Sequence, residues 1–308
     1  MTAKVKKPER ERSNIFNSRS EPLIYLIPFF AGLVLFTIYP VINVVIMSFK
    51  QGFKLSGAYN GIGLGNYIKV LSDPYFLSAI KNTFIYAFTV VPIATLISLL
   101  LANLLNQKIK GIAFFHTAYF LPLVTSTIAV GLVWKYMFNE QYGFINFMIT
   151  LFGGEPINWL GAIKGQAPYN IVVVIIFGIY NMLPMTTILL LSGLQNIDPL
   201  YYTAAKVDGA STWKLYSRII IPLLSPTIFL TMVINTISAF KVYNEISPFW
   251  RGQAGVTGTN LYTMVYYIKE TFYSNHKLGN AAAASIVLFL IIFAFTMLQL
   301  YIQKKNDN

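Results

Sequence analysis

Long apolar stretches separated by polar connectors dominate the pattern of hydrophobic and polar positions along the chain. A helix needs about 20 mainly apolar residues to cross the hydrocarbon core of a membrane, and it satisfies its own backbone hydrogen bonds there. Six stretches reach this length, so the pattern predicts an all-α integral membrane protein with six transmembrane helices. The predicted spans are 23–48, 80–105, 115–138, 169–194, 219–240 and 281–302.

The connectors alternate between two kinds, as they must when successive loops face opposite sides of a membrane. Those at 49–79, 139–168 and 246–280 are long, whereas 106–114 is very short and 195–218 is polar and amphipathic. Lysine and arginine concentrate in 1–20, in the connectors 106–114 and 195–218, and at the C-terminus. The positive-inside rule therefore predicts a basic cytoplasmic tail at 1–20, one transmembrane domain at 21–303 and a cytoplasmic C-terminus at 304–308.

Composition agrees with the membrane class and removes several classes of enzyme. Only 11% of the residues are charged, whereas a soluble domain carries about 25%. The chain has no cysteine and only two histidines, His116 and His276, so thiolate metal sites are excluded and no metal centre is expected. We expect the net charge of +12 to set topology and to meet anionic lipids of the bilayer, and we expect no nucleic acid partner.

The most informative connector is 197–226, IDPLYYTAAKVDGASTWKLYSRIIIPLLSP. Asp198-Pro199 is typical of a helix start, and Gly209 can end that helix. Leu200, Thr203, Ala204 and Val207 share a modest apolar face, and Ala210 to Tyr216 can form a second short helix. The residues alone leave two interpretations open: an ordinary interfacial amphipathic helix, or a part that docks on a partner protein and transmits its movement.

This connector resembles the EAA loop of ABC importer permeases. The matching residues are Ala204, Ala205, Asp208, Gly209, Ala210, Trp213, Ile219, Pro222 and Pro226. The likeness extends to GLGNYIKVLSDPYFLSAIKNT at 63–83, YFLP at 119–122, INWLG at 157–161 and LSGLQNID at 191–198. Together these motifs resemble carbohydrate importers of the maltose-permease type, on the large-subunit side. Thr203 replaces the glutamate that opens the family's motif, and RGQAGVTG at 251–258 replaces its Gly-Gly-Pro.

The resemblance implies a permease subunit in the cell membrane that forms, with a second homologous permease, the path for a sugar or oligosaccharide delivered by an extracytoplasmic solute-binding protein. A separate nucleotide-binding ATPase dimer would use ATP and magnesium, so this chain is expected to bind no cofactor and to be no enzyme. The sequence contains no G-x-x-x-x-G-K-[ST] phosphate loop, which agrees with that division. The ATPase is expected at Tyr202, Thr203, Ala204, Ala205, Lys206, Asp208, Gly209 and Ala210.

The resemblance also implies solute contacts on the third, fourth and fifth spans. The matching positions are Leu123, Thr127, Gly178, Asn181, Met182, Ser238, Ala239 and Val242. Lys241 and Glu245 are two further candidates, because residues four apart on a helix share a face and can pair. One interpretation places this pair at the mouth of the solute path; the other ends the fifth span near Phe240 and leaves both residues at the outer interface.

Three alternatives accompany this interpretation. A permease for glycerol-3-phosphate is the nearest, although a doubly charged anion favours a basic cavity and Lys241 is thin support for one. A secondary transporter should carry acidic residues inside its spans, and the predicted spans hold almost none apart from Glu245. A membrane enzyme would need paired carboxylates at the surface, whereas helix geometry accounts for Asp198 and Asp208.

Overall fold

The structure is a computed structural model that describes residues 21–54, 56–107, 110–160, 169–250 and 261–306. The chain divides into two compact units, residues 1–46 and 47–308. The predicted basic tail at 1–20 lies outside the described residues. Nearly all described elements are helices, which confirms the predicted all-α class.

The first predicted span forms α1 (Glu21–Leu33), a π-helical turn η1 (Val34–Ile38) and α2 (Tyr39–Phe49). The widened turn lies directly before Pro40, which has no amide hydrogen to donate to the preceding turn. A second π-helical turn, η3 (Tyr216–Ile220), lies in the same way before Pro222. Proline therefore accounts for the local change of helix type at both places.

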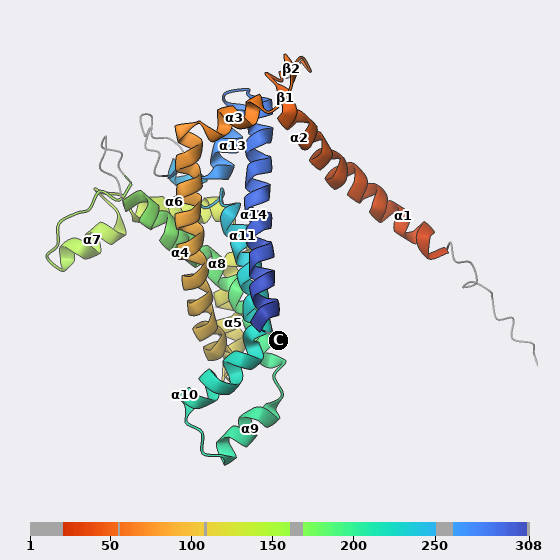
Figure 1. The fold of residues 1–308 in the computed structure, drawn as a ribbon. Coiled ribbons are helices and arrows are strands. Elements are labelled where there is room, and N and C mark those ends of the chain that lie inside the picture. Colours follow the sequence, from red (N-terminus) through yellow and green to blue (C-terminus); the bar gives the residue numbers. More distant parts are fainter. Residues whose placement is uncertain (1–20, 55, 108–109, 161–168, 251–260, 307–308) are drawn as a thin grey trace, which may run out of the picture. The chain divides into compact units, whose positions relative to one another are not determined.

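Four long helices form the bundle of the second unit. They are α4 (Pro74–Leu105), α8 (Tyr169–Gln195), α11 (Ile221–Phe240), which continues from α10 (Thr212–Leu215) through η3, and α14 (Leu278–Asn306). The helix α4 packs against α8 and α11, and α14 packs against α11 (Figure 1). Among the described residues, five helical stretches are long and apolar enough to cross a membrane, or six if one bent pair counts as a span.

The bent pair corrects the prediction for the third span. One continuous helix over 115–138 was wrong, because α5 (Ile112–Phe120) and the 3-10 turn η2 (Leu121–Val124) meet α6 (Thr127–Met137) at an angle of 97°. Thr125 between them has extended backbone, with ψ of 149°. Ser126 starts the new helix by accepting the amide hydrogen of Ala129 at 3.5 Å. Local capping and Pro122 therefore break a stretch whose hydropathy is continuous.

Two clusters of buried side chains hold the bundle together. The larger contains Phe76 and Tyr86 of α4, Phe177 of α8 and Phe240 of α11. The smaller joins Leu190 and Leu194 of α8 to Leu224 of α11, together with residues of the polar connector 195–218. Helix association in lipid depends on such close van der Waals packing, because lipid chains are themselves apolar.

The remaining elements are short and connect the spans. Strand β1 (Lys50–Gln51) pairs antiparallel with β2 (Gly61–Ile62). The short helices are α3 (Gly65–Leu71), α7 (Phe144–Leu151), α9 (Pro199–Val207), α12 (Ser247–Trp250) and α13 (Met264–Tyr273). Figure 1 shows α3 and α13 at one end of the bundle and α9 and α10 at the other.

An aspartate fastens α13 to the start of α4. Asp73 caps α4 by accepting the amide hydrogen of Tyr75 at 2.9 Å, and its second oxygen accepts the Tyr267 hydroxyl at 2.8 Å. Burial, together with the hydrogen bond to Asp73, raises the pKa of Tyr267. The hydrogen bond from the Tyr267 hydroxyl to Asp73 therefore keeps α13 in place against the start of α4.

Candidate functional site

The polar connector contains the predicted pair of short helices. Asp198 starts α9 by accepting the amide hydrogen of Leu200 at 2.8 Å, and Pro199 occupies the first helical turn. Gly209 then has φ of +69°, a left-handed conformation that glycine adopts without strain. Ser211 caps α10 by accepting the amide hydrogen of Lys214 at 3.4 Å. The helix–glycine–helix prediction is confirmed, although the second helix begins at Thr212 and not at Ala210.

One face of this loop is fastened to the bundle. Ala205 and Leu215 are buried in the smaller cluster, and Tyr202 and Ala210 pack against it. The hydroxyl of Tyr216 donates a hydrogen bond to the side-chain oxygen of Asn103 near the end of α4. Burial, and secondarily the neighbouring Tyr216, raise the pKa of Tyr202. A displacement of the loop would therefore be transmitted directly to α4, α8 and α11.

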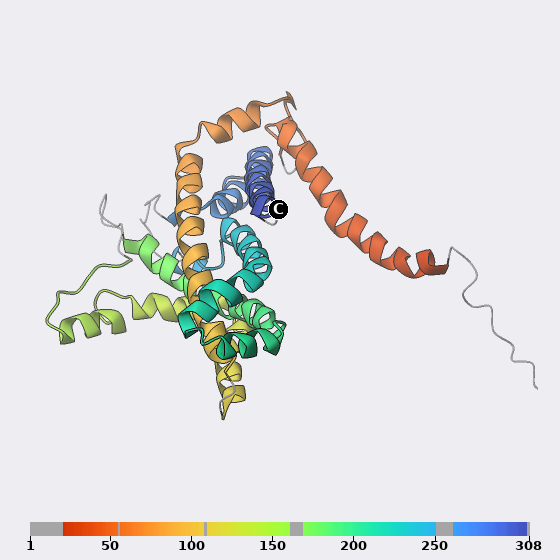
Figure 2. The same cartoon turned by 60° about the horizontal axis from the view of Figure 1, so that its bottom comes forward.

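The opposite face of the loop is open. The exposed predicted residues are Thr203, Ala204, Lys206, Asp208 and Gly209. Three large apolar side chains accompany them: Leu200 is 70% exposed, Val207 82% and Trp213 79%. Thr203 carries no charge, and its hydroxyl donates to the carbonyl oxygen of Pro199 at 3.2 Å. Figure 2 shows α9 and α10 from their free end of the bundle.

A cavity of about 240 Å³ lies among the spans. Tyr86 of α4 lines one side, residues of α8 and α11 line the others, and Glu245, beyond the end of α11, also lines it. The residues that line it are Tyr86, Gly178, Asn181, Met182, Met185, Ile234, Asn235, Ser238, Ala239 and Glu245.

Hydrogen bonds between helices hold the polar side chains of this cavity. Asn181 donates from Nδ2 to Oε1 of Glu245 at 3.0 Å, which joins α8 to the segment after α11. Asn235 donates from Nδ2 to Oγ1 of Thr186 at 3.0 Å, which joins α11 to α8. A methyl group added at Gly178 would collide with the hydroxyl of Tyr86. The glycine is therefore what lets the tyrosine ring lie against α8.

The structure brings together most of the predicted solute-path residues. Those that line the cavity are Gly178, Asn181, Met182, Ser238, Ala239 and Glu245. Leu123 and Thr127 lie on either side of the bend in the third span and do not line it. Val242 is buried in the larger cluster, and Lys241 is exposed.

Of the two interpretations of Lys241 and Glu245, the structure supports the one in which the fifth span ends near Phe240. The helix α11 ends at Phe240, and Lys241 is its C-cap residue. The chain then turns, with the amide of Val242 donating to the carbonyl of Ala239 at 3.2 Å. The two residues consequently do not share a helical face, and Asn181 is the hydrogen-bond partner of Glu245.

Tyr86, Met185 and Ile234 of the cavity wall were not predicted. A tyrosine inside the apolar second span is a polar signal that could have indicated the first. Met185 and Ile234 are ordinary apolar residues of membrane helices, so no sequence pattern distinguishes them from lipid-facing neighbours.

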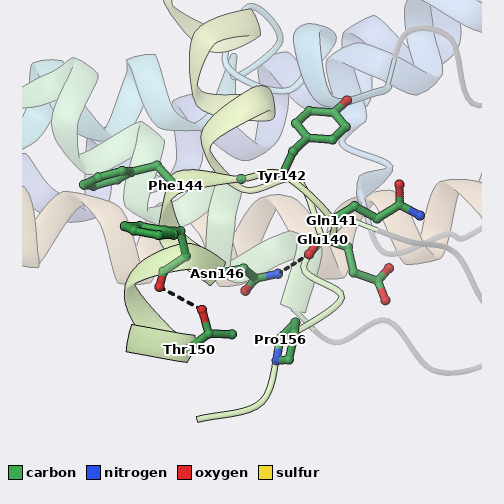
Figure 3. Close-up of a pocket in the computed structure, with 9 residues that line it drawn as sticks. Glu140, Gln141, Tyr142, Phe144, Asn146, Thr150 and Pro156 are labelled. Atoms are coloured by element: carbon green, nitrogen blue, oxygen red, sulfur yellow. Dashed lines mark hydrogen bonds between the residues drawn. The ribbon is translucent and has the colours of Figure 1, made fainter. Parts of the chain in front are cut away.

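A second cavity, of about 410 Å³, lies on the connector that contains α7, well apart from α9 and α10 (Figure 1). Figure 3 shows Glu140, Gln141 and Tyr142 on the chain before α7, with Phe144 and Asn146 on the helix. Asn146 donates to the carbonyl oxygen of Glu140 at 3.0 Å and to that of Ile157 at 2.8 Å. It also accepts from the indole of Trp159 at 2.9 Å, so one side chain holds this connector together.

The bundle, the fastened loop and the interior cavity define a multi-span membrane protein built to work with a partner at one end. The chain belongs to the family of binding-protein-dependent transport system inner membrane components, whose pattern matches residues 61–308. It is therefore a multi-pass transport subunit of the cytoplasmic membrane, and the resemblance to ABC importer permeases is confirmed.

Two relatives and one solved structure illustrate the likeness. The chain is 31% identical to the arabinooligosaccharides transport system permease protein AraP of Halalkalibacterium halodurans, over 95% of this chain and 92% of that protein. It is 32% identical to the lactose transport system permease protein LacF of Rhizobium radiobacter, over 92% and 94%. A crystal structure of a bacterial ABC transporter involved in the import of the acidic polysaccharide alginate superimposes with a TM-score of 0.80 at 22% identity, covering 93% of this chain and 96% of that one.

Proposed function

We propose that this chain is a permease subunit of an ABC importer for a saccharide. With a second permease it forms the translocation path, and a solute-binding protein delivers the solute from outside. The two relatives described above, named for arabinooligosaccharides and lactose, support the saccharide. The family description itself includes dependence on a binding protein.

The loop α9–Gly209–α10 carries the proposal. A partner that grips its open face, around Val207 and Trp213, would push on Tyr202 and Ala205 of the fastened face. Those residues pack against α8 and α11, the two helices that supply most of the cavity wall. Closing of an ATPase dimer would thus change the cavity by moving whole helices, a rigid-body transition.

The loop is proposed to face the cytoplasm together with both termini. Figure 1 shows the C-terminal end of α14 at the same end of the bundle as α9 and α10. Lys304 and Lys305 end α14, and Lys206, Lys214 and Arg218 lie in the loop region. Such a gathering of basic residues is typical of a cytoplasmic membrane face.

ATP and magnesium are proposed to be bound by the separate ATPase, and this chain to contribute only to the solute path that it forms with the second permease. The cavity supports that division, because its lining of two amides, two hydroxyls and one carboxylate suits hydroxylated solutes. Among the described residues that line it there is no basic side chain that would favour glycerol-3-phosphate, the nearest alternative.

Reconstitution of the whole importer in liposomes tests this function. We expect uptake of a neutral disaccharide or oligosaccharide that requires ATP, the binding protein and the ATPase together. ATP hydrolysis should rise when the loaded binding protein is added. Uptake by this chain without the ATPase would contradict the proposal, and ATP-dependent uptake of glycerol-3-phosphate alone would select the alternative.

A further inference from the structure

The cavity among the spans, of about 240 Å³, has one charged side chain among the described residues that line it. Among the described residues that line it, Glu245 is the sole carboxylate, and no lysine, arginine or histidine joins it. The remaining polar lining consists of Asn181, Asn235, Ser238 and the hydroxyl of Tyr86. Any solute that enters therefore meets a negative group with no basic side chain of the same wall beside it.

The position of this carboxylate is held from both sides. Asn181 of α8 donates to its Oε1 at 3.0 Å. Val242, three residues before Glu245, is 2% exposed, and Ile246, the next residue, is fully buried. Both belong to the larger cluster, so the turn that contains Glu245 is anchored there. Glu245 itself is only partly buried, which leaves the group both fixed in place and accessible from the cavity.

Lys241 does not offset this charge within the cavity. It caps α11, its side chain is exposed, and it is absent from the cavity lining. The turn at 241–246 separates it from the helical face on which it could have paired with Glu245. Charge interactions weaken with distance and with exposure to water, so a bound solute interacts more strongly with the carboxylate that lines the cavity than with an exposed lysine outside the lining.

We propose that Glu245 makes this permease selective for uncharged saccharides over anionic ones. The inference rests on the proposed function and specifies the charge of its substrate class. Hydroxyl groups of a neutral sugar can donate hydrogen bonds to a carboxylate, which is a strong charge-assisted acceptor. A uronate or phosphate group brings a second negative charge, so the same position repels it. Glu245 acts by direct contact with the solute, and the hydrogen bond from Asn181 holds its carboxylate in position. No covalent step is involved.

The test compares two solutes and several variants in the complete importer, reconstituted in liposomes. From a panel of neutral disaccharides that includes lactose and arabinobiose, the one taken up best is paired with its counterpart carrying one uronic acid. We expect Glu245→Gln to raise the ratio of anionic to neutral uptake about tenfold, as for a change of ~1.4 kcal/mol. The binding protein is the same in every sample, so a change in this ratio originates in the permease.

Matched variants separate the charge from its surroundings. Glu140→Gln removes the same charge at an exposed position on the second cavity and should leave the ratio unchanged. Glu245→Asp keeps the charge and should keep the preference for the neutral sugar. If Glu245→Gln does not assemble, Ser238→Lys, at an exposed cavity position, should shift the ratio in the same direction.

The outcomes for the inference and for the proposed function are distinct. An unchanged ratio in Glu245→Gln or Ser238→Lys, with neutral uptake intact, would overturn the selectivity role and leave the saccharide importer standing. Failure of the unaltered importer to take up any disaccharide of the panel would refute the proposed function itself, and the inference with it.

Discussion

At position 203 a threonine stands where the motif of related loops has a glutamate. Its hydroxyl is satisfied within α9 by the carbonyl of Pro199, so it offers a partner neither charge nor an unsatisfied donor. Large apolar side chains are exposed around it, above all Val207 and Leu200, beside the charged Lys206 and Asp208. We infer that docking of the ATPase depends on burying these groups more than on an ion pair.

Val207→Lys tests this at a single side chain. Burial of one aliphatic side chain contributes about 1.5–3 kcal/mol, so we expect the ATPase to bind the permease at least about tenfold more weakly. Binding of the isolated ATPase to the detergent-solubilised permease pair would measure it. Ile62→Lys is the control, because Ile62 is 73% exposed on β2 and should tolerate the change. Equal affinities for the two variants would contradict the apolar interface.

Gly178 is a second residue at which a single added methyl group is expected to affect stability and transport. Gly178→Ala places a methyl group against the hydroxyl of Tyr86, whose side chain is 2% exposed and has little room to withdraw. Overpacking of this kind destabilises by about 1–3 kcal/mol. We expect a lower midpoint of thermal unfolding in detergent and slower uptake, since Tyr86 lines the cavity and a displaced ring would change its wall.

The control for this substitution is Gly61→Ala, where an added methyl group meets nothing within 4 Å. Its unfolding midpoint and uptake should match those of the unaltered protein. A Gly178→Ala protein as stable and active as the control would show that Tyr86 does not depend on the missing side chain of Gly178.

At the level of elements, the turn between α9 and α10 decides whether the loop acts as one body. Gly209→Ala forces an L-residue into a left-handed conformation, at a cost of about 1–2 kcal/mol, and should shift α10 relative to α9. We expect fewer saccharide molecules transported per ATP hydrolysed, with the permease still present in the membrane. Parallel measurements of uptake and phosphate release give this quantity.

Gly57→Ala is the matched control for the turn. Gly57 also has positive φ, +83°, and an added methyl group at either glycine meets nothing within 4 Å. The two substitutions thus introduce the same kind of backbone strain, but only one lies in the loop. Transport per ATP should fall for Gly209→Ala alone, and an equal fall in both variants would remove the special role of the loop.

For the whole molecule, the orientation in the membrane is the prediction on which the rest depends. The chain has no cysteine, so a single introduced cysteine gives an unambiguous label. Gln141→Cys and Thr212→Cys are both at exposed positions. We expect a membrane-impermeant maleimide to label the first in intact cells and the second only after permeabilisation. Labelling of Thr212→Cys from outside would place the loop beyond the reach of an ATPase in the cytoplasm.

Hydropathy and capping by themselves determined the spans other than the bent third one, and the two short helices of the loop. Both depend on local properties: a helix in lipid needs length and apolar side chains, and Asp198, Pro199 and Gly209 act on their own neighbours. For that reason the predicted boundaries of the fourth and fifth spans lie close to the ends of α8 and α11.

Only the tertiary structure decided what depends on contacts between distant segments. Tyr86, Asn181 and Glu245 meet at one cavity although they are far apart in the chain, and periodicity cannot indicate which helices are neighbours. Packing also selected which face of α9 is buried, and the end of α11 at Phe240 separated Lys241 from Glu245. The physical reason is the same in each case: composition and spacing act along the chain, whereas side-chain packing and interhelical hydrogen bonds act across it.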